Sequence, residues 1–248
     1  MHIKKVISCF LLGAPAISVA LSLRLVTFNI RGGTPAKLSY NEQPWSTRRP
    51  LLMNQVSHTV NSAPKEALTI IAMQEIPDAV LNEVETDLGP EWKHIGVGRD
   101  DGKKEGEYAP ILYKESDIKV LFTETKWLSP TPDVPSKGWN ARTKRIVTIG
   151  VFERKACGSK LIVANTHLDH VSEEARIEGV KVILARIKLL QQRWGPLPVS
   201  VTGDFNSEAG QVAYGEMVGA GYKDSFNMTA EAKRFGPFAT SVTPHIFD

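Results

Sequence analysis

Four short apolar segments most strongly constrain the fold of this 248-residue chain, because each is rich in β-forming residues and each runs into polar ones. They lie at 23–30, 68–73, 161–166 and 197–202. Runs of this length and composition are typical of strands buried in a sheet. Helical patterns separate some of them, while consecutive strands fill the middle of the chain. Two sheets packed face to face, with helices outside, is the α/β architecture that fits this order best.

Helices and further strands are predicted around these four segments. Ser46 or Thr47 can cap a helix that runs to about Ser62, with Leu51 and Leu52 on or near its apolar face. Other helices are predicted at 77–88, 173–193 and 208–218, and other strands at 92–97, 109–113, 118–127 and 145–152. A loop rich in Pro, Gly and Ser lies at 129–138.

Polar side chains stand where the four segments end: Asn29, Glu75, His167, Asp204 and Asn206. Taken singly, Glu75 suits a solvated strand end and Asn29 suits a turn. Together they are the parts for attacking a phosphate ester, because a carboxylate can activate water or hold a metal while His and amide groups donate to phosphate oxygens. Oxygen ligands of this kind suit Mg²⁺ or Mn²⁺. The pattern of Cys and His residues does not suit structural zinc.

Residues 1–20 have the pattern of a secretion signal. Lys4 and Lys5 precede an apolar stretch, and small residues precede Ala20. An uncleaved anchor or a buried first helix is the alternative. Cleavage would lower the formal charge from +3 to +1, since the segment holds two lysines and no acidic residue. A net charge this close to zero is weak evidence for a polyanionic partner. Cleavage would also leave Cys157 as the single cysteine, so we expect no intramolecular disulfide.

Four motifs in order carry a resemblance that covers nearly all of the chain from residue 23. They are Thr-Phe-Asn-Ile-Arg at 27–31, Met-Gln-Glu at 73–75, Asn-Thr-His-Leu-Asp-His at 165–170 and Thr-Gly-Asp-Phe-Asn-Ser at 202–207. The series resembles the endonuclease/exonuclease/phosphatase superfamily, which has the deoxyribonuclease I-like fold. The resemblance implies a four-layered α/β sandwich, at 21–248, that hydrolyses phosphate esters with a divalent metal.

The same resemblance implies roles for the five strand-end residues. Glu75 would hold the Mg²⁺ or Mn²⁺ ion, with Asn29 nearby in the same pocket. Asp204 would orient or deprotonate the attacking water. Asn206 and His167 would contact the phosphate and offset charge in the transition state, where loss of one such donor typically costs ~10²–10³ in rate.

Finer motifs resemble a secreted or bacterial branch of the superfamily. Arg99 and Arg145 are candidate substrate contacts, because guanidinium matches phosphate oxygens bidentately. Their alternative is a surface or strand-pairing arginine. Tyr108 is a candidate to line the site, and its alternative is a core aromatic. Asn140 stands where that branch usually has Asp.

The family pattern closes with a strand that carries Asp and then with a Ser-Asp-His motif, and this sequence contains no Ser-Asp-His. We therefore expect the domain at 21–248 to be incomplete, with its last strands missing. A truncated gene model or splice form, a degenerate non-catalytic homologue and an unusual active variant all fit that expectation. His245 stands too early, without a preceding Asp, to take the missing role.

The function favoured by the sequence is a secreted, divalent-metal-dependent phosphoesterase. Its substrate class stays open among nucleic acid, a sugar or inositol phosphate, and a phospholipid head group. A deadenylase-type RNA exonuclease or other nuclease is the second hypothesis, and a catalytically inactive phosphate-binding homologue is the third. Neither a membrane span nor an obligate protein partner is expected.

Overall fold

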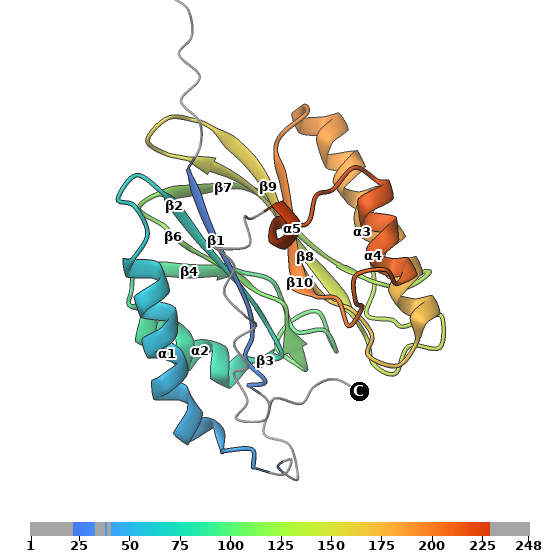
Figure 1. Cartoon of the computed structure of the whole chain (residues 1–248), viewed down its shortest axis with the longest axis horizontal. Coiled ribbons are helices and arrows are strands. Elements are labelled where there is room, and N and C mark those ends of the chain that lie inside the picture. Colours follow the sequence, from blue (N-terminus) through green and yellow to red (C-terminus); the bar gives the residue numbers. More distant parts are fainter. Residues whose placement is uncertain (1–21, 33–37, 39–40, 229–248) are drawn as a thin grey trace, which may run out of the picture.

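The computed structural model describes residues 22–32, 38 and 41–228, and two sheets lie face to face within it, between two layers of helices (Figure 1). The predicted signal segment and His245 lie outside the described residues. The first sheet has the strand order β1-β2-β6-β4, with bounds Leu23–Asn29, Leu68–Gln74, Ile111–Lys114 and Trp92–Ile95. The second has the order β10-β9-β8-β7, with bounds Val199–Asp204, Lys160–His167, Ile146–Arg154 and Ile118–Trp127. The predicted four-layered sandwich is confirmed.

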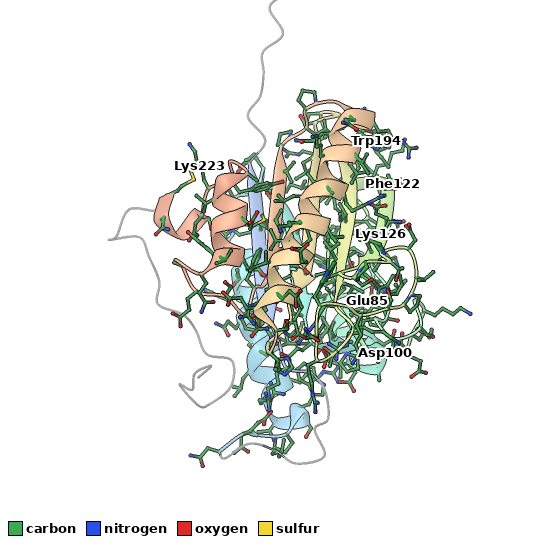
Figure 2. All side chains as sticks on the ribbon, turned by 90° about the vertical axis from the view of Figure 1, so that its right-hand side faces the viewer. Glu85, Asp100, Phe122, Lys126, Trp194 and Lys223 are labelled. Carbon is green, nitrogen blue, oxygen red and sulfur yellow. The ribbon has the colours of Figure 1, made fainter. Side chains whose placement is uncertain are left out.

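The helices cover the outer faces of the two sheets. Helices α1 (Trp45–Asn61) and α2 (Asp78–Leu88) lie on the first sheet, while α3 (Glu173–Trp194) and α4 (Val212–Gly219) lie on the second (Figure 1). Figure 2, turned by 90°, shows α3 and α4 side by side on that outer face. The remaining elements are the short pair β3 (Ile76–Pro77) and β5 (Glu107–Tyr108), and helix α5 (Ser225–Met228).

Four clusters of buried apolar residues lie in the described part of the chain: one between the sheets, one beneath each helical layer, and a small one formed by Ala109, Trp127 and Ile146. Phe152 from β8 and Ile70 from β2 lie fully buried in the core between the sheets. Val180 and Ile183 of α3 face the second sheet, as the helical spacing of its apolar residues requires. Burial of this kind is the main force that fixes the two sheets against each other.

Three local expectations differ from the structure. Ser46 and Thr47 do not cap α1, because the helix already begins at Trp45, after Pro44. Leu51 is 70% exposed, because α1 turns Leu52 and not Leu51 into the core. The helix predicted from 208 begins only at Val212, since Glu208 and Gln211 first close a turn through the Gln211 N–H to Glu208 O bond.

Among the described residues, no helix combines the length and apolar character that crossing a bilayer demands.

Candidate active site

The ends of β9 and β10 bring His167 and Asp204 side by side. The two strands are parallel, and their register pairs Asp204 with His167. Gly203 allows this close pairing: its φ is +151°, and a Cβ at this position would collide with the main-chain oxygen of Thr166. Parallel strands present their carboxyl ends at one edge of the sheet, which is why two motifs almost forty residues apart form one site.

Two site residues adopt the left-handed backbone conformation, which costs energy for side chains other than glycine. Glu75 has φ +56° and Asn206 has φ +44°. Each is held by a hydrogen bond. Glu75 O accepts from Gly32 N at 2.8 Å, and Asn206 N donates to Asp204 Oδ1 at 3.0 Å. Such strain persists where the surroundings over-determine the backbone, and it concentrates at functional sites.

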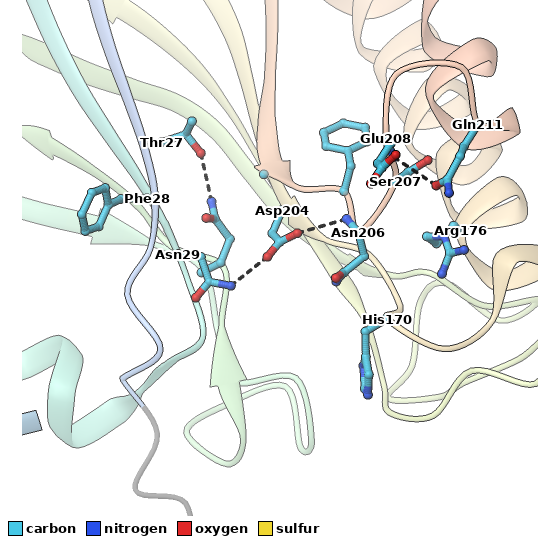
Figure 3. Close-up of a pocket in the computed structure, with 13 residues that line it drawn as sticks. Thr27, Phe28, Asn29, His170, Arg176, Asp204, Asn206, Ser207, Glu208 and Gln211 are labelled. Atoms are coloured by element: carbon cyan, nitrogen blue, oxygen red, sulfur yellow. Dashed lines mark hydrogen bonds between the residues drawn. The ribbon is translucent and has the colours of Figure 1, made fainter. Parts of the chain in front are cut away.

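Asn29 joins the two sheets at the site. Its Nδ2 donates to Glu75 Oε1 and to Asp204 Oδ2, both at 2.8 Å. Figure 3 shows the second of these bonds. Its Oδ1 accepts from Arg31 N at 3.0 Å, which fixes the orientation of the amide because a backbone N–H can only donate. In this arrangement Asn29 holds the two carboxylates together through its nitrogen. Its predicted place among the metal ligands stays a prediction.

His167 is buried and uncharged near neutral pH. Burial lowers the pKa of its imidazole well below the ordinary value, and the positive charges of Arg145 and Arg99 lower it further. Its Nε2 lies 3.0 Å from Asn206 Nδ2, which also donates to Leu168 O at 3.0 Å. An amide nitrogen can only donate, so Nε2 accepts and the proton sits on Nδ1. Asn206 therefore fixes the tautomer of His167, and its predicted contact with phosphate stays a prediction.

Glu75, His167 and Asp204 form a group that could hold a metal ion. One ligand atom from each lies within 4.8 Å of the others, and His167 Nε2 is 4.0 Å from Glu75 Oε1 and 3.8 Å from Asp204 Oδ2. The two carboxylates are donors that fit a divalent cation, and His167 Nε2 could join them only by giving up the hydrogen bond that it accepts from Asn206. We call the region formed by Asn29, Glu75, His167, Asp204 and Asn206 the carboxylate end of the site.

A buried amide pair supports the carboxylate end from behind. Gln74 Nε2 donates to Asn165 Oδ1 at 2.7 Å, and Asn165 Nδ2 donates to Met73 O at 2.7 Å and Pro110 O at 2.8 Å. These bonds tie β9 to β2 in a region without solvent, where hydrogen bonds are strongest. The two strands that carry Glu75 and His167 are thus fixed relative to each other.

The three predicted substrate contacts lie beside the carboxylate end, and their contacts are mostly with the protein. Arg99 Nη1 pairs with Glu107 Oε2 at 2.6 Å, and burial raises the pKa of the Glu107 carboxyl. The Tyr108 hydroxyl lies 2.9 Å from both Asp78 Oδ1 and Lys103 O, and burial raises its pKa. Tyr108 also packs in the core beneath the first helical layer. The substrate roles of Arg99 and Tyr108 stay predictions.

Arg145, the third of them, lies behind a histidine that the sequence argument did not single out. Its side chain is only 6% exposed, and its Nη2 is 2.9 Å from His170 Nδ1. Its Nε is 3.7 Å from Asp169 Oδ2, beyond hydrogen-bond distance, and both Nε and Nη1 are buried without a hydrogen-bond partner. Arg145 is thus one step removed from the cavity wall, and its predicted substrate contact stays a prediction.

Asp169 organises the loop between β9 and α3. Its two carboxylate oxygens accept hydrogen bonds from the backbone N–H groups of Arg142, Thr143, Val171 and Ser172 at 2.9–3.4 Å. Burial by itself raises the pKa of Asp169, but these N–H groups outweigh it, so the net pKa lies below the ordinary value. The carboxylate holds this loop, and with it His170, in place.

An open cavity of about 930 Å³ runs from the carboxylate end toward α4 (Figure 3). Thr27, Phe28 and Asn29 line one side of it, and Asp204 and Asn206 line the other. Its far part is lined by residues outside the predicted site, namely His170, Arg176, Phe205, Ser207, Glu208 and Gln211. His170 ends the Asn-Thr-His-Leu-Asp-His motif at 165–170, but nothing in the sequence separates its role from that of its neighbours.

Comparison with solved structures places the chain in a family. It is 33% identical to a mannosyl-6-phosphatase of Bacteroides thetaiotaomicron, with a TM-score of 0.73 over 81% of this chain and 71% of that one. It is 36% identical to an endonuclease/exonuclease/phosphatase protein of Bacteroides vulgatus, with a TM-score of 0.69 over 82% of this chain and 72% of that one. The chain belongs to the endonuclease/exonuclease/phosphatase family, as its motifs predict.

More distant structures share the fold. The catalytic domain of human Nocturnin, with a bound sulfate anion, aligns with a TM-score of 0.64 at 17% identity, over 89% of this chain and 80% of that one. At this identity the likeness shows the fold alone. No family model and no curated protein sequence matches the chain.

Proposed function

We propose that this protein is a secreted, Mg²⁺-dependent phosphoesterase whose reaction takes place at the carboxylate end. One observation carries the proposal: Asn29 bridges Glu75 and Asp204 from strands of both sheets, with His167 beside them. Two carboxylates forced together cost energy through their mutual repulsion. A bound cation relieves that cost, so the arrangement favours divalent-ion binding.

The residues present fit such an ion. Glu75 and Asp204 would hold it through carboxylate oxygens, with the neutral imidazole of His167 within reach. When bound, a divalent ion supplies Lewis-acid polarisation of a phosphate oxygen. Mg²⁺ suits the oxygen-rich donor set, and Mn²⁺ accepts the same ligands.

The side chains then divide the remaining work. Asp204 lines the cavity. It accepts a proton from a water molecule while the oxygen of that water bonds to phosphorus and the ester bond breaks. Asn29 keeps the Asp204 carboxylate oriented, and Asn206 fixes the tautomer of His167. The leaving oxygen takes a proton from solvent and Asp204 later releases its proton to solvent, so the products are an alcohol and a phosphate group bearing the oxygen of water.

The relatives support phosphate-ester chemistry, and one of them supports a monoester substrate. The protein that shares 33% identity with this chain is a mannosyl-6-phosphatase, which acts on a sugar phosphate. A nuclease would need a positive stripe with stacking aromatics to follow a polyanion. The formal charge of +3 for the entire chain gives little support to that reading.

The direct test is hydrolysis of p-nitrophenyl phosphate, a monoester, and bis(p-nitrophenyl) phosphate, a diester, with Mg²⁺, Mn²⁺ or EDTA. We expect metal-dependent turnover that EDTA abolishes and added Mg²⁺ restores. No turnover of either ester with either metal would favour the catalytically inactive phosphate-binding homologue. Preference for the diester, with turnover of polyadenylate, would favour the nuclease hypothesis.

Secretion is a separate part of the proposal and rests on the sequence of residues 1–20. Expression of the full chain in a secreting host should place the protein in the medium, with a new N-terminus at Leu21 found by mass spectrometry. Retention of an intact Met1 inside the cell would contradict it.

A further inference from the structure

The far part of the cavity is polar, and we call its lining by His170, Arg176, Ser207, Glu208 and Gln211 the recognition wall. It continues from Asp204 and Asn206 toward α3 and α4, so it stands beside any phosphate held at the carboxylate end (Figure 3). Hydrolysis of a phosphate ester releases an alcohol, which before the reaction is attached to phosphorus through the ester oxygen. The recognition wall is where the part of the substrate beyond the ester oxygen has room to lie.

Two buried polar atoms of the recognition wall have no hydrogen-bond partner among the residues that the structure describes. Arg176 Nη1 donates to Asp169 O at 2.9 Å, whereas Arg176 Nε has no hydrogen-bond partner. Ser207 Oγ is likewise buried without a partner. Buried polar groups are normally hydrogen-bonded, and leaving one unpaired is costly. Both residues line the cavity through other atoms, so a ligand with oxygen atoms would satisfy Arg176 Nε and Ser207 Oγ once the two side chains turn toward it.

Arg145 gives His170 a defined donor. A guanidinium carries no acceptor, so at 2.9 Å His170 Nδ1 must accept from Arg145 Nη2. An imidazole that accepts at Nδ1 carries its proton on Nε2. His170 lines the cavity, and the buried Arg145 therefore makes it a hydrogen-bond donor to whatever lies there. Arg145 is a positioning residue in this arrangement, acting through His170.

The charges of the recognition wall favour a neutral ligand rich in hydroxyl groups over a second anion. Arg176 is positive and Glu208 is negative, so their formal charges cancel, and the carboxylate would repel another phosphate. A hydroxyl group both donates and accepts, which matches a wall holding donors and acceptors together. Phe205 on the same cavity offers apolar surface for the C–H face of a sugar ring, whereas the Phe28 ring packs against the core beneath the first helical layer.

We propose that the recognition wall binds the polyhydroxylated alcohol part of a phosphate monoester, so that the substrate class is sugar phosphates. The inference rests on the proposed function, since it assumes that the phosphate lies at the carboxylate end. Arg176 and His170 contact sugar hydroxyl groups, and Arg145 holds His170 in the donating tautomer.

The test compares two monoesters that differ only in the alcohol. Mannose 6-phosphate carries hydroxyl groups, while p-nitrophenyl phosphate carries none that the wall could bind. In Arg176→Gln and His170→Phe we expect kcat/KM for mannose 6-phosphate to fall ~10–100-fold, the usual effect of losing a hydrogen bond to a polar ligand. For p-nitrophenyl phosphate we expect less than about a threefold change in kcat/KM, because that ester makes no such bond.

Two further variants separate contact from positioning. His170→Gln keeps a donor near the Nε2 position and should recover most of the sugar-phosphate activity that His170→Phe loses. Arg145→Gln should lower kcat/KM for mannose 6-phosphate more than for p-nitrophenyl phosphate, because it releases the tautomer of His170 in addition to removing a positive charge near His167. Lys188→Gln is the matched control on the exposed face of α3 and should leave both substrates unaffected. Equal losses on both substrates in Arg176→Gln and His170→Phe would overturn the proposal.

A binding measurement keeps the wall testable should turnover be absent. Calorimetric titration of the full chain, in Mg²⁺, compares mannose 6-phosphate with inorganic phosphate. If the recognition wall binds the sugar, mannose 6-phosphate should bind ~10-fold or more tightly than inorganic phosphate. Arg176→Gln should remove that difference in affinity. Equal affinity of the wild-type protein for both ligands would contradict the wall, whereas lack of hydrolysis with preferential sugar-phosphate binding would contradict only the proposed function.

Discussion

The two ends of the cavity satisfy their polar groups in different ways. At the carboxylate end, Asn29 bonds both Glu75 and Asp204, and Asn206 bonds His167, so the side chains orient one another before any ligand arrives. At the recognition wall, Arg176 Nε and Ser207 Oγ are buried without a partner. His167 Nδ1 is also buried without a partner among the described residues, so the contrast lies in the carboxylates and amides. Those of the carboxylate end are held by contacts within the protein, while the recognition wall keeps hydrogen-bonding capacity for a ligand.

Removing the carboxylate of Asp204 should have the largest effect on activity. In Asp204→Asn the side chain can no longer accept the proton of water or bind the cation with full charge. We expect kcat for p-nitrophenyl phosphate to fall by about 10³-fold or more, while circular dichroism and the melting temperature show a folded protein. Ser200→Ala, earlier on the same strand, is the control and should stay within about twofold of wild type. Turnover near the wild-type rate in Asp204→Asn would sink the assignment of the carboxylate end.

Loss of the bridge at Asn29 should come next. Asn29→Ala leaves two carboxylates adjacent without the amide that bonds both. Their repulsion should turn them apart, and we expect kcat to fall about 10²-fold, with a higher Mg²⁺ concentration needed for half-maximal rate. Rate measurements across a Mg²⁺ series check this. An unchanged metal requirement in Asn29→Ala would show that the bridge does not organise the carboxylates.

Asp169 allows the recognition wall to be disturbed while all five side chains of the carboxylate end stay unchanged. Asp169→Asn replaces an acceptor of four backbone N–H groups with an amide that can accept with only one atom, so unfolding free energy at pH 7 should drop by about 2 kcal/mol. Urea unfolding measures this. Activity toward mannose 6-phosphate should fall more than activity toward p-nitrophenyl phosphate, since His170 follows Asp169 directly.

The pH dependence of that loss has a defined sign. The pKa of Asp169 is lower in the folded state than in the unfolded chain, so its ionisation stabilises the fold above the unfolded pKa of about 4. The stabilisation disappears as pH falls through the folded pKa. The difference in unfolding free energy between wild type and Asp169→Asn should therefore be full at pH 7 and shrink below about pH 4. A difference that grows toward acid pH would contradict this account.

The sequence could predict which strands converge but not how their end residues bond. Strand ends are readable because apolar β-rich runs stop at polar residues, and this located Asn29, Glu75 and His167 in one region. The orientation of Asn29 depends on Arg31 N, and the left-handed backbone of Glu75 depends on tertiary contacts. Neither leaves a pattern in the chain, because both are decided by groups brought together only in the folded state.

The recognition wall was beyond the reach of sequence patterns for a similar reason. In the sequence, Arg176 is an ordinary helical residue, and Arg145 is a candidate phosphate contact or a strand-pairing arginine. Only the structure shows that Arg145 contacts His170, which lines the cavity. Leu51 illustrates the limit within a helix, since spacing places it near the apolar face while packing leaves it in solvent. Burial and hydrogen-bond partners, which periodicity does not encode, decide these cases.

The central claim is that the carboxylate end holds a divalent cation, and Mn²⁺ binding followed by electron paramagnetic resonance tests it most directly. Titration of the full chain should show Mn²⁺ bound at this site, displaced by excess Mg²⁺, with affinity about tenfold or more weaker in Glu75→Gln because one charged ligand is lost. The matched variant Glu83→Gln, on α2, should bind as wild type does. Equal Mn²⁺ affinity in wild type and Glu75→Gln, or no binding by the wild-type chain, would contradict the claim.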